Sequence, residues 1–160
     1  GAVAINQFIR RILSRLTTRF NVIHLCGKNN LDPSLENTPS YKQFEYVDED
    51  LPHLMALASL IISRAGANSI YEFLALKKPN ILIPLPLSAS RGDQIQNAQS
   101  FERQGFSKVL DQETLTDDIL LTSILDVYAN RQKYIDRMAE MDHTKGVERI
   151  MDIINEYAKP

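Results

Sequence analysis

The stretch from Ser59 to Ile83 decides the fold, and it reads SLIIS-RAGA-NSIYEFLAL-KKP-NILI. The segment Ser59–Ser63 is too short and too rich in β-branched residues for a helix, so it predicts a strand. A helix over Asn68–Leu76 follows the turn, and it places Ile70, Phe73 and Leu74 on one apolar face. Asn80–Ile83 is a second short apolar run, which Pro84 stops. Two continuous apolar strands joined by a helix indicate a parallel sheet covered on both faces.

The same alternation extends in both directions along the chain. An apolar stripe from Ile5 to Leu16 predicts a first helix, and Asp50 is expected to cap a helix that Pro52 begins. A helix over Asp93–Gln104 is expected to end at Gly105, and Thr116 begins helices that continue toward the C-terminus. The remaining strands are expected at Asn21–Cys26, Gln43–Val47 and Phe106–Leu110. The sequence therefore predicts an α/β, Rossmann-like domain with a parallel sheet.

Composition limits the classes of function. The 160 residues make one domain, with 44% apolar and 24% charged residues. A single cysteine, Cys26, excludes an internal disulfide framework, and its apolar strand favours an inert core thiol. The net charge of −2 argues against nucleic acid as a partner. No apolar run approaches the ~20 residues of a membrane helix.

Two features of the central stretch suggest a ligand site, because ligands bind beyond the carboxyl ends of parallel strands. Small residues from Ser63 through Gly66 and Ala67 to Asn68 open a helix whose free N–H groups suit a diphosphate, and Arg64 adds charge. The alternative is a tight turn that needs Gly66 for geometry alone. Glu72 suits the two hydroxyls of a ribose, and the alternative for it is an exposed helix glutamate.

A third loop, Ser88–Ala98, carries neutral amides and one carboxylate at the start of a helix. Such groups hydrogen-bond sugar hydroxyls. The alternative is that Asp93 caps the helix while Gln94 and Asn97 are solvated. Asparagine is a poor residue for a helix interior, which favours a role for Asn97.

Metal chemistry has weak support in the sequence. The acidic stretch Asp48-Glu49-Asp50 resembles an Asp-x-Asp metal motif, but its place before a helix favours capping. The three histidines, His24, His53 and His143, lack a spacing typical of metal ligands. We therefore expect no metal and no cofactor.

The chain opens on a helix, whereas alternating α/β domains normally open on a strand. Gly1-Ala2 directly before that helix is typical of the end of a phosphate-binding turn that follows a strand. These two residues predict that a first strand, with part of a glycine-rich turn, lies upstream of Gly1.

Together these motifs resemble the donor-binding half of glycosyltransferase family 28, the UDP-GlcNAc transferases that complete lipid II in bacterial peptidoglycan synthesis. The resemblance covers nearly the whole chain. It is carried by Ile62–Phe73 (ISRAGANSIYEF), Lys78–Pro84 (KPNILIP) and Asp93–Ala98 (DQIQNA), and by Gly1-Ala2 with Ile5-Asn6 and Tyr46-Val47. It implies the C-terminal domain of a two-domain GT-B fold, spanning residues 1–160 as a single domain without its first strand.

The resemblance also implies a role for each candidate residue. The Val47 backbone would bind uracil, and Glu72 would hold the ribose. The diphosphate would lie against the turn that contains Ser63, Arg64, Gly66, Ala67 and Asn68. Asp93, where some relatives carry glutamine, and Gln94 would bind the GlcNAc ring, with Asn97 supporting the site.

The implied activity is an inverting transfer of GlcNAc from UDP-GlcNAc to a lipid-linked MurNAc-pentapeptide, which converts lipid I to lipid II. No residue of this chain is a convincing catalytic base. Acceptor and membrane contact would come through the absent half, at the cytoplasmic, inner face of the bacterial membrane, and the chain alone would bind donor without turnover. Two alternatives stay open: a separate donor-binding subunit of a split GlcNAc transferase, and a GT-B transferase that glycosylates another lipid.

Overall fold

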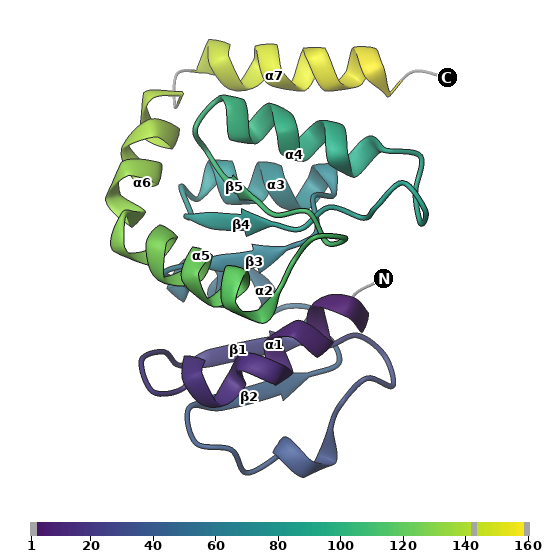
Figure 1. The fold of residues 1–160 in the computed structure, drawn as a ribbon. Coiled ribbons are helices and arrows are strands. Elements are labelled where there is room, and N and C mark those ends of the chain that lie inside the picture. Colours follow the sequence, from purple (N-terminus) through teal and green to yellow (C-terminus); the bar gives the residue numbers. More distant parts are fainter. Residues whose placement is uncertain (1–2, 142–143, 159–160) are drawn as a thin grey trace.

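The computed structural model describes residues 3–141 and 144–158, and it shows helices alternating with short parallel strands (Figure 1). The chain begins with α1 (Val3–Leu16) and β1 (Val22–Leu25), and a 3₁₀ turn, η1 (Pro33–Leu35), precedes β2 (Tyr41–Phe44). The later elements are α2 (Leu51–Leu57), β3 (Ile61–Ser63), α3 (Ala67–Ala75), β4 (Asn80–Leu82), α4 (Asp93–Arg103), β5 (Lys108–Val109), α5 (Asp117–Ala129), α6 (Arg131–Glu140) and α7 (Thr144–Tyr157). The α/β class with parallel strands is confirmed.

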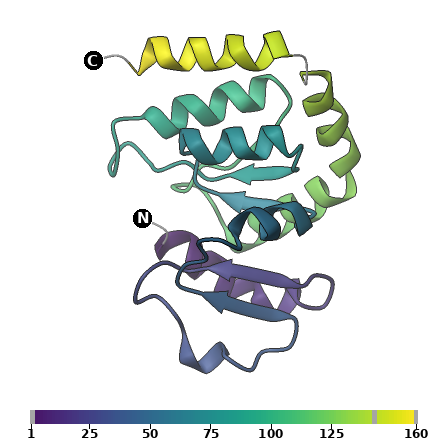
Figure 2. The same cartoon turned by 180° about the vertical axis from the view of Figure 1, so that it is seen from behind.

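Strands β3, β4 and β5 form one parallel sheet with β4 at its centre. Helix α5 lies on one face of this sheet, and α3 and α4 lie on the other (Figures 1 and 2). All three residues of β4 are buried, as the continuous apolar run predicts. The stretch from Ser59 to Ile83 therefore forms the β–α–β unit at the centre of the domain.

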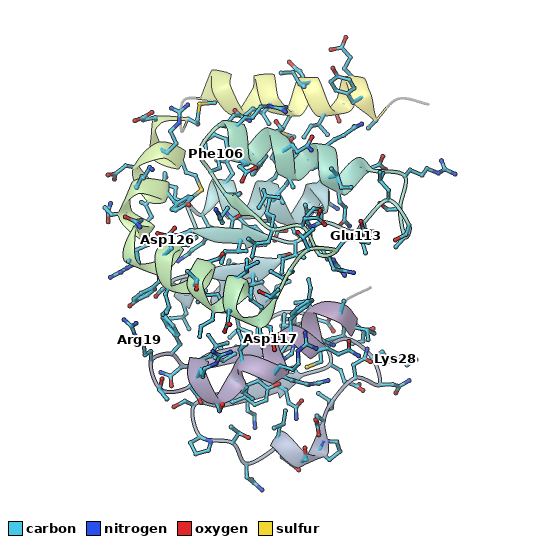
Figure 3. The ribbon with its side chains drawn as sticks, viewed as in Figure 1. Arg19, Lys28, Phe106, Glu113, Asp117 and Asp126 are labelled. Carbon is cyan, nitrogen blue, oxygen red and sulfur yellow. The ribbon has the colours of Figure 1, made fainter. Side chains whose placement is uncertain are left out.

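Two hydrophobic cores cover the two faces of the β3–β4–β5 sheet. Core residues on the first face come from α1, β4 and α5: Ile5, Ile9, Ile12, Leu16, Ile81, Leu120, Ile124 and Val127. Those on the second face come chiefly from α3, α4 and the end of α6, and include Ile70, Phe73, Phe101, Phe106 and Met138. The apolar stripe of α1 is confirmed, and its basic face pairs with α5 through Arg11–Asp117 and Arg15–Asp118 at the surface. Figure 3 shows Asp117 where α5 meets α1.

The strands are divided between two sheets. β1 pairs with β2 in a separate two-stranded parallel sheet, and β3 does not pair with β1. The apolar sequence of β1 predicts a strand buried on both faces. In the structure Ile23 and Leu25 are 50% and 38% exposed, so one face of β1 is open. Helix α1 links the two sheets. Its apolar side chains belong to a core against which both Val22 of β1 and Ile62 of β3 pack.

Several predicted boundaries are wrong. β2 begins at Tyr41 and ends at Phe44, so Val47 lies beyond the strand, and β5 is only two residues long. Asp50 occupies the N-cap position of α2 but makes no side-chain capping hydrogen bond. Thr116 does cap α5, accepting a hydrogen bond from the Ile119 N–H. Among the described residues, no helix is long and apolar enough to cross a membrane.

Candidate ligand-binding site

The candidate residues lie where the parallel strands end. The loop from Arg64 to Gly66 joins β3 to α3, and a longer loop from Ile83 to Gly92 joins β4 to α4. Because β3 and β4 run in the same direction, both loops leave the sheet at its carboxyl edge, where open α/β sheets bind ligands. Nine of the ten candidates come from this edge of the β3–β4–β5 sheet. Val47 comes from the other sheet, on the loop between β2 and α2.

The turn before α3 is open. Gly66 is the N-cap residue, so no side chain satisfies the first N–H groups of the helix. Its φ of −68° is available to any residue, and a Cβ built there would meet no atom within 4 Å. Chain geometry therefore does not require glycine here, and the open space lies beside the positive end of the α3 dipole. An anion fits this arrangement.

Arg64 points back along the sheet. Its Nη1 donates to the carbonyl oxygens of Ile83 at 3.0 Å and Pro84 at 3.4 Å, which joins the ends of β3 and β4. Burial lowers the pKa of this guanidinium from its ordinary value. The positive charge of Arg64 therefore lies beside the turn before α3, while its Nη1 is already hydrogen-bonded to backbone carbonyls. Ser63 likewise donates its hydroxyl to the neighbouring Arg64 carbonyl.

Helix α4 holds both loops through side-chain amides. Asn97 Nδ2 donates to the Ala65 carbonyl at 3.1 Å, and Gln94 Oε1 accepts from the Leu85 N–H at 3.0 Å. The Gln94 amide group thus keeps its Nε2 for another partner. Asp93 is exposed in the first turn of α4 and does not cap it, because Gly92, at φ 90°, occupies the N-cap position.

Glu72 lies one turn further along α3, with an exposed side chain. It borders a cavity of about 440 Å³ together with Asn68 and Tyr71 of the same helix. The Tyr71 hydroxyl is buried there without a hydrogen-bond partner, and burial raises its pKa. Leu74 and Ala75 of α3 and Met151 of α7 complete its lining, so the cavity runs along α3 toward α7, and Asn68 is its lining residue nearest the open turn.

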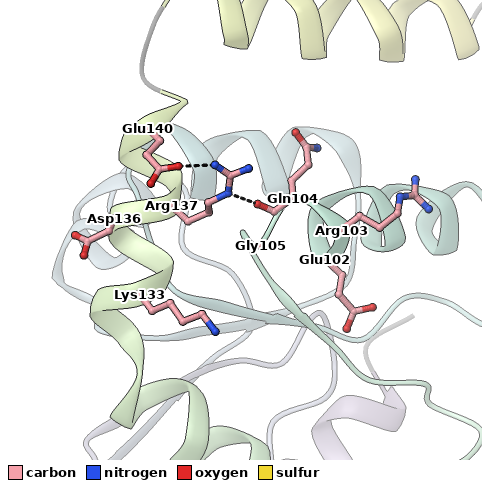
Figure 4. A pocket seen from close by; sticks show the side chains of 8 residues that line it. All are labelled: Glu102, Arg103, Gln104, Gly105, Lys133, Asp136, Arg137 and Glu140. Atoms are coloured by element: carbon pink, nitrogen blue, oxygen red, sulfur yellow. Dashed lines mark hydrogen bonds and ion pairs between the residues drawn. The ribbon is translucent and has the colours of Figure 1, made fainter.

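A larger cavity of about 660 Å³ lies elsewhere (Figure 4). Gly105, which borders it, precedes β5, so the cavity opens at the amino edge of the sheet. Its side chains include three acidic and three basic residues, and Arg137 is already bonded to the Gln104 carbonyl and to Glu140. Acidic and basic side chains are equal in number here, so the lining has no net charge that would select an anion such as a diphosphate.

The structure contains a buried polar cluster that the sequence does not predict. The His24 ring contacts Asn6 Oδ1 at 2.9 Å and the Tyr41 hydroxyl at 2.8 Å, and all three side chains are buried. Spacing in the sequence gave no sign of it, because residues 6, 24 and 41 come from three elements. Cys26 is a free, fully buried thiol, as expected, and burial raises its pKa. His143 lies outside the described residues.

His24 makes stability depend on pH. Burial, with a smaller contribution from the Arg10 charge, lowers the pKa of His24 from 6.5 to about 4. The folded protein therefore favours the neutral ring, and stability present above pH 6.5 is lost as pH falls toward 4. We expect urea unfolding to show a loss on the order of 2 kcal/mol between pH 7 and pH 5. The His24→Gln variant, which does not titrate, should lose clearly less, and equal losses would refute the assignment.

The acidic stretch does not form a metal centre. Within residues 3–141 and 144–158, no three His, Cys, Asp or Glu side chains gather as metal ligands would. Asp48, Glu49 and Asp50 are all exposed on the loop before α2.

Comparison with known proteins places this geometry among glycosyltransferases. The sequence matches the glycosyltransferase family 28 C-terminal domain over residues 1–154. A UDP-N-acetylglucosamine–N-acetylmuramyl-(pentapeptide) pyrophosphoryl-undecaprenol N-acetylglucosamine transferase of Clostridium perfringens is 54% identical over 158 residues. The match covers 99% of this chain and 44% of that protein. A Clostridium botulinum protein of the same name is 52% identical, with 99% and 45% covered. The chain therefore spans less than half the length of these relatives.

Solved structures agree on the fold. The crystal structure of Acinetobacter baumannii MurG has a TM-score of 0.76 at 23% identity, covering 98% of this chain and 46% of that one. The kitacinnamycin glycosyltransferase has a TM-score of 0.70 at 18% identity, with 94% and 39% covered. At these identities the likeness concerns the fold alone.

Proposed function

Because the chain belongs to the glycosyltransferase family 28 C-terminal domain family, we propose that it binds UDP-GlcNAc as the donor half of an inverting N-acetylglucosaminyltransferase. The whole enzyme would convert lipid I to lipid II in peptidoglycan synthesis. The observation that carries the proposal is the open turn at Gly66, where the unfilled space meets the uncapped start of α3.

The diphosphate lies against this turn in the proposed complex. The N–H groups of Ala67 and Asn68 face it at the helix start, and Ser63 borders it. Arg64 contributes positive charge close by while it fixes the ends of β3 and β4. Charge grows on the diphosphate as UDP leaves, and the helix start stabilises that charge without a metal.

The sugar lies toward α4. Asp93 is exposed at the start of that helix, and Gln94 retains its Nε2 donor, so both suit the hydroxyls of a GlcNAc ring. Asn97 supports the site by holding the Ala65 carbonyl. Glu72 accepts the ribose hydroxyls, and the Val47 backbone binds uracil from the β2–α2 loop.

Transfer proceeds by attack of the acceptor C4 hydroxyl on the anomeric carbon, with departure of UDP. The attacking hydroxyl needs a base, and none of the ten proposed site residues is placed as one. We assign the base and the lipid-linked MurNAc-pentapeptide acceptor to the rest of the enzyme, which would work at the cytoplasmic face of the membrane. The names of the Clostridium relatives include N-acetylmuramyl-(pentapeptide) pyrophosphoryl-undecaprenol, which supports the lipid-linked acceptor.

A transfer assay tests the proposal. A two-domain polypeptide that joins this chain to the proposed acceptor half, given labelled UDP-GlcNAc and lipid I, should form labelled lipid II, and this chain alone should form none. A product formed only on another lipid acceptor, such as diacylglycerol, would contradict the assigned acceptor. Activity that appears only after a separate partner polypeptide is added would instead favour a split transferase.

The divided sheet supports a further part of the proposal, that a strand preceding α1 completes the domain between β1 and β3. On β1, Val22 and Cys26 donate to Ser40 and Phe44 on the β2 side, so the peptide groups of Ile23 and Leu25 point away from β2. The chain enters α1 at the carboxyl edge, level with the space between the two sheets (Figures 1 and 2). A parallel strand inserted there would lead directly into α1 with a right-handed crossover to β1.

Hydrogen exchange tests this strand. In the chain as it stands, the amides of Ile23, Leu25 and Ile62 should exchange quickly, because they lie on unpaired strand edges. In the two-domain polypeptide, which carries the proposed strand, they should exchange at least about 100-fold more slowly, on the scale of the local stability of a core strand. Ile81 on the central strand β4 serves as the control with little change. Equal exchange of the three edge amides in both proteins would rule out the inserted strand.

A further inference from the structure

A chain of hydrogen bonds crosses three elements in the β1–β2 sheet. The Tyr41 hydroxyl lies 2.8 Å from His24 Nδ1, and His24 Nε2 lies 2.9 Å from Asn6 Oδ1. Asn6 Nδ2 then donates to the Cys26 carbonyl at 2.8 Å. The three side chains are 6%, 7% and 2% exposed, respectively, so water does not replace these partners.

Only one proton arrangement satisfies every group of this Tyr41–His24–Asn6 chain. The Cys26 carbonyl accepts, so Asn6 presents its NH₂ group to Cys26 and its oxygen to His24. That oxygen accepts from His24 Nε2–H, which leaves Nδ1 of the neutral ring to accept from the Tyr41 hydroxyl. Loss of any one member leaves a buried polar group unpaired.

The Tyr41–His24–Asn6 chain ends at the carboxyl edge of the sheet. Asn6 lies in the first part of α1, and Cys26 directly follows β1. Arg10, one helical turn beyond Asn6, contacts Cys26 Sγ at 3.5 Å and donates to the Asn30 carbonyl. Asn6 and Arg10 thus fix the loop that leaves β1 against α1. The charged and titratable groups around the His24 ring are Arg10 from α1, Tyr41 from β2 and Cys26 from the end of β1.

We propose that Tyr41, His24 and Asn6 are positioning residues that hold the amino end of α1 at the carboxyl edge where the donor binds. None of the three is among the ten residues proposed to contact the donor. The proposal rests on the proposed function, because it gives these residues a part in donor affinity. A polar chain suits this task better than apolar packing, since hydrogen-bond direction fixes both the rotation and the height of α1 against β1.

A first experiment does not involve the nucleotide. Tyr41→Phe removes one hydroxyl and leaves His24 Nδ1 unpaired, so three hydrogen-bonded amides should exchange about tenfold faster than in the unmodified chain: those of Gln7 and Arg10 in the first turns of α1 and that of Gly27, which donates to the Glu45 carbonyl. Tyr134→Phe, on α6 and outside the hydrogen-bond chain, is the matched control and should leave these three amides unchanged. Unchanged exchange in Tyr41→Phe would overturn the positioning role, whatever the chain binds.

A second experiment measures UDP-GlcNAc affinity in the two-domain polypeptide of the proposed function. His24→Leu should raise Kd about tenfold, and His24→Gln, which can both donate to Asn6 and accept from Tyr41, should restore Kd to within threefold. Asn80→Leu breaks another buried polar cluster, with Ser107, and should lower stability without changing Kd. Equal Kd values for the leucine and glutamine variants would overturn the proposal. If the unmodified polypeptide shows no UDP-GlcNAc binding, the proposed function fails and the exchange result alone decides the positioning role.

Discussion

Gly66→Val should abolish donor binding while the fold survives. The valine side chain would fill the space beside the start of α3, where nothing lies within 4 Å of a built Cβ. The backbone at φ −68° accepts valine, so we expect the free energy of unfolding to change by no more than about 1 kcal/mol. UDP-GlcNAc affinity should fall by at least about 100-fold, which corresponds to roughly 3 kcal/mol. Calorimetry and urea unfolding on the same preparation give both quantities.

Gly92→Ala provides the contrast. Gly92 has φ 90°, and a Cβ there would meet Leu87 Cδ2 at 3.1 Å, so this substitution should cost stability. The two glycines therefore differ: the backbone at Gly92 requires glycine, whereas the backbone at Gly66 does not, and there the proposal assigns glycine to leaving room for the diphosphate. Donor affinity that survives in Gly66→Val would remove the diphosphate from this turn and leave the glycine without a role in binding.

Glu72→Ala should weaken UDP-GlcNAc binding by about 1–3 kcal/mol, the scale for losing hydrogen bonds to a charged group. The carboxylate is exposed beside the α3 cavity and is available to two ribose hydroxyls. A nucleotide that lacks both hydroxyls should bind the unmodified chain and the variant equally, because the interaction is then absent from both.

Glu102→Ala is the matched control for Glu72. Glu102 is an exposed glutamate of α4 that borders the cavity at the opposite edge of the sheet, so its loss should leave Kd unchanged. If Glu72→Ala weakens the dideoxy nucleotide as much as UDP-GlcNAc, the carboxylate acts elsewhere than on the ribose.

Local patterns predicted the central part of the fold. The stripe from Ile5 to Leu16 and the β–α–β unit around Gly66 depend on periodicity and on turn chemistry, which neighbouring residues determine. Strand ends were less predictable, because a strand ends where its partner ends: β2 begins at Tyr41, opposite Val22, and stops at Phe44. The missing capping bond of Asp50 likewise depends on a backbone angle that composition does not reveal.

The residues of the candidate site could be predicted from the sequence, but the hydrogen bonds between them could not. Gly66, Gln94 and Asn97 could be singled out by residue type, but the bonds from Asn97 to Ala65 and from Gln94 to Leu85 require α4 to pack beside both loops. His24 was beyond reach for the same reason, since its partners lie 17 and 18 residues away in the sequence. Hydrogen bonds between side chains of distant elements produce no regular spacing in the sequence, so they cannot be predicted from it.

Calorimetric titration of UDP-GlcNAc, with GDP-mannose in parallel, tests the donor site most directly. It should be run on this chain and on the proposed two-domain polypeptide, because the proposed first strand is expected to complete the sheet and strengthen binding. We expect saturable heat with UDP-GlcNAc and at least about tenfold weaker binding of GDP-mannose, a difference of roughly 1.4 kcal/mol. Absence of binding to UDP-GlcNAc in both proteins, or equal affinity for the two nucleotide sugars, would contradict the account.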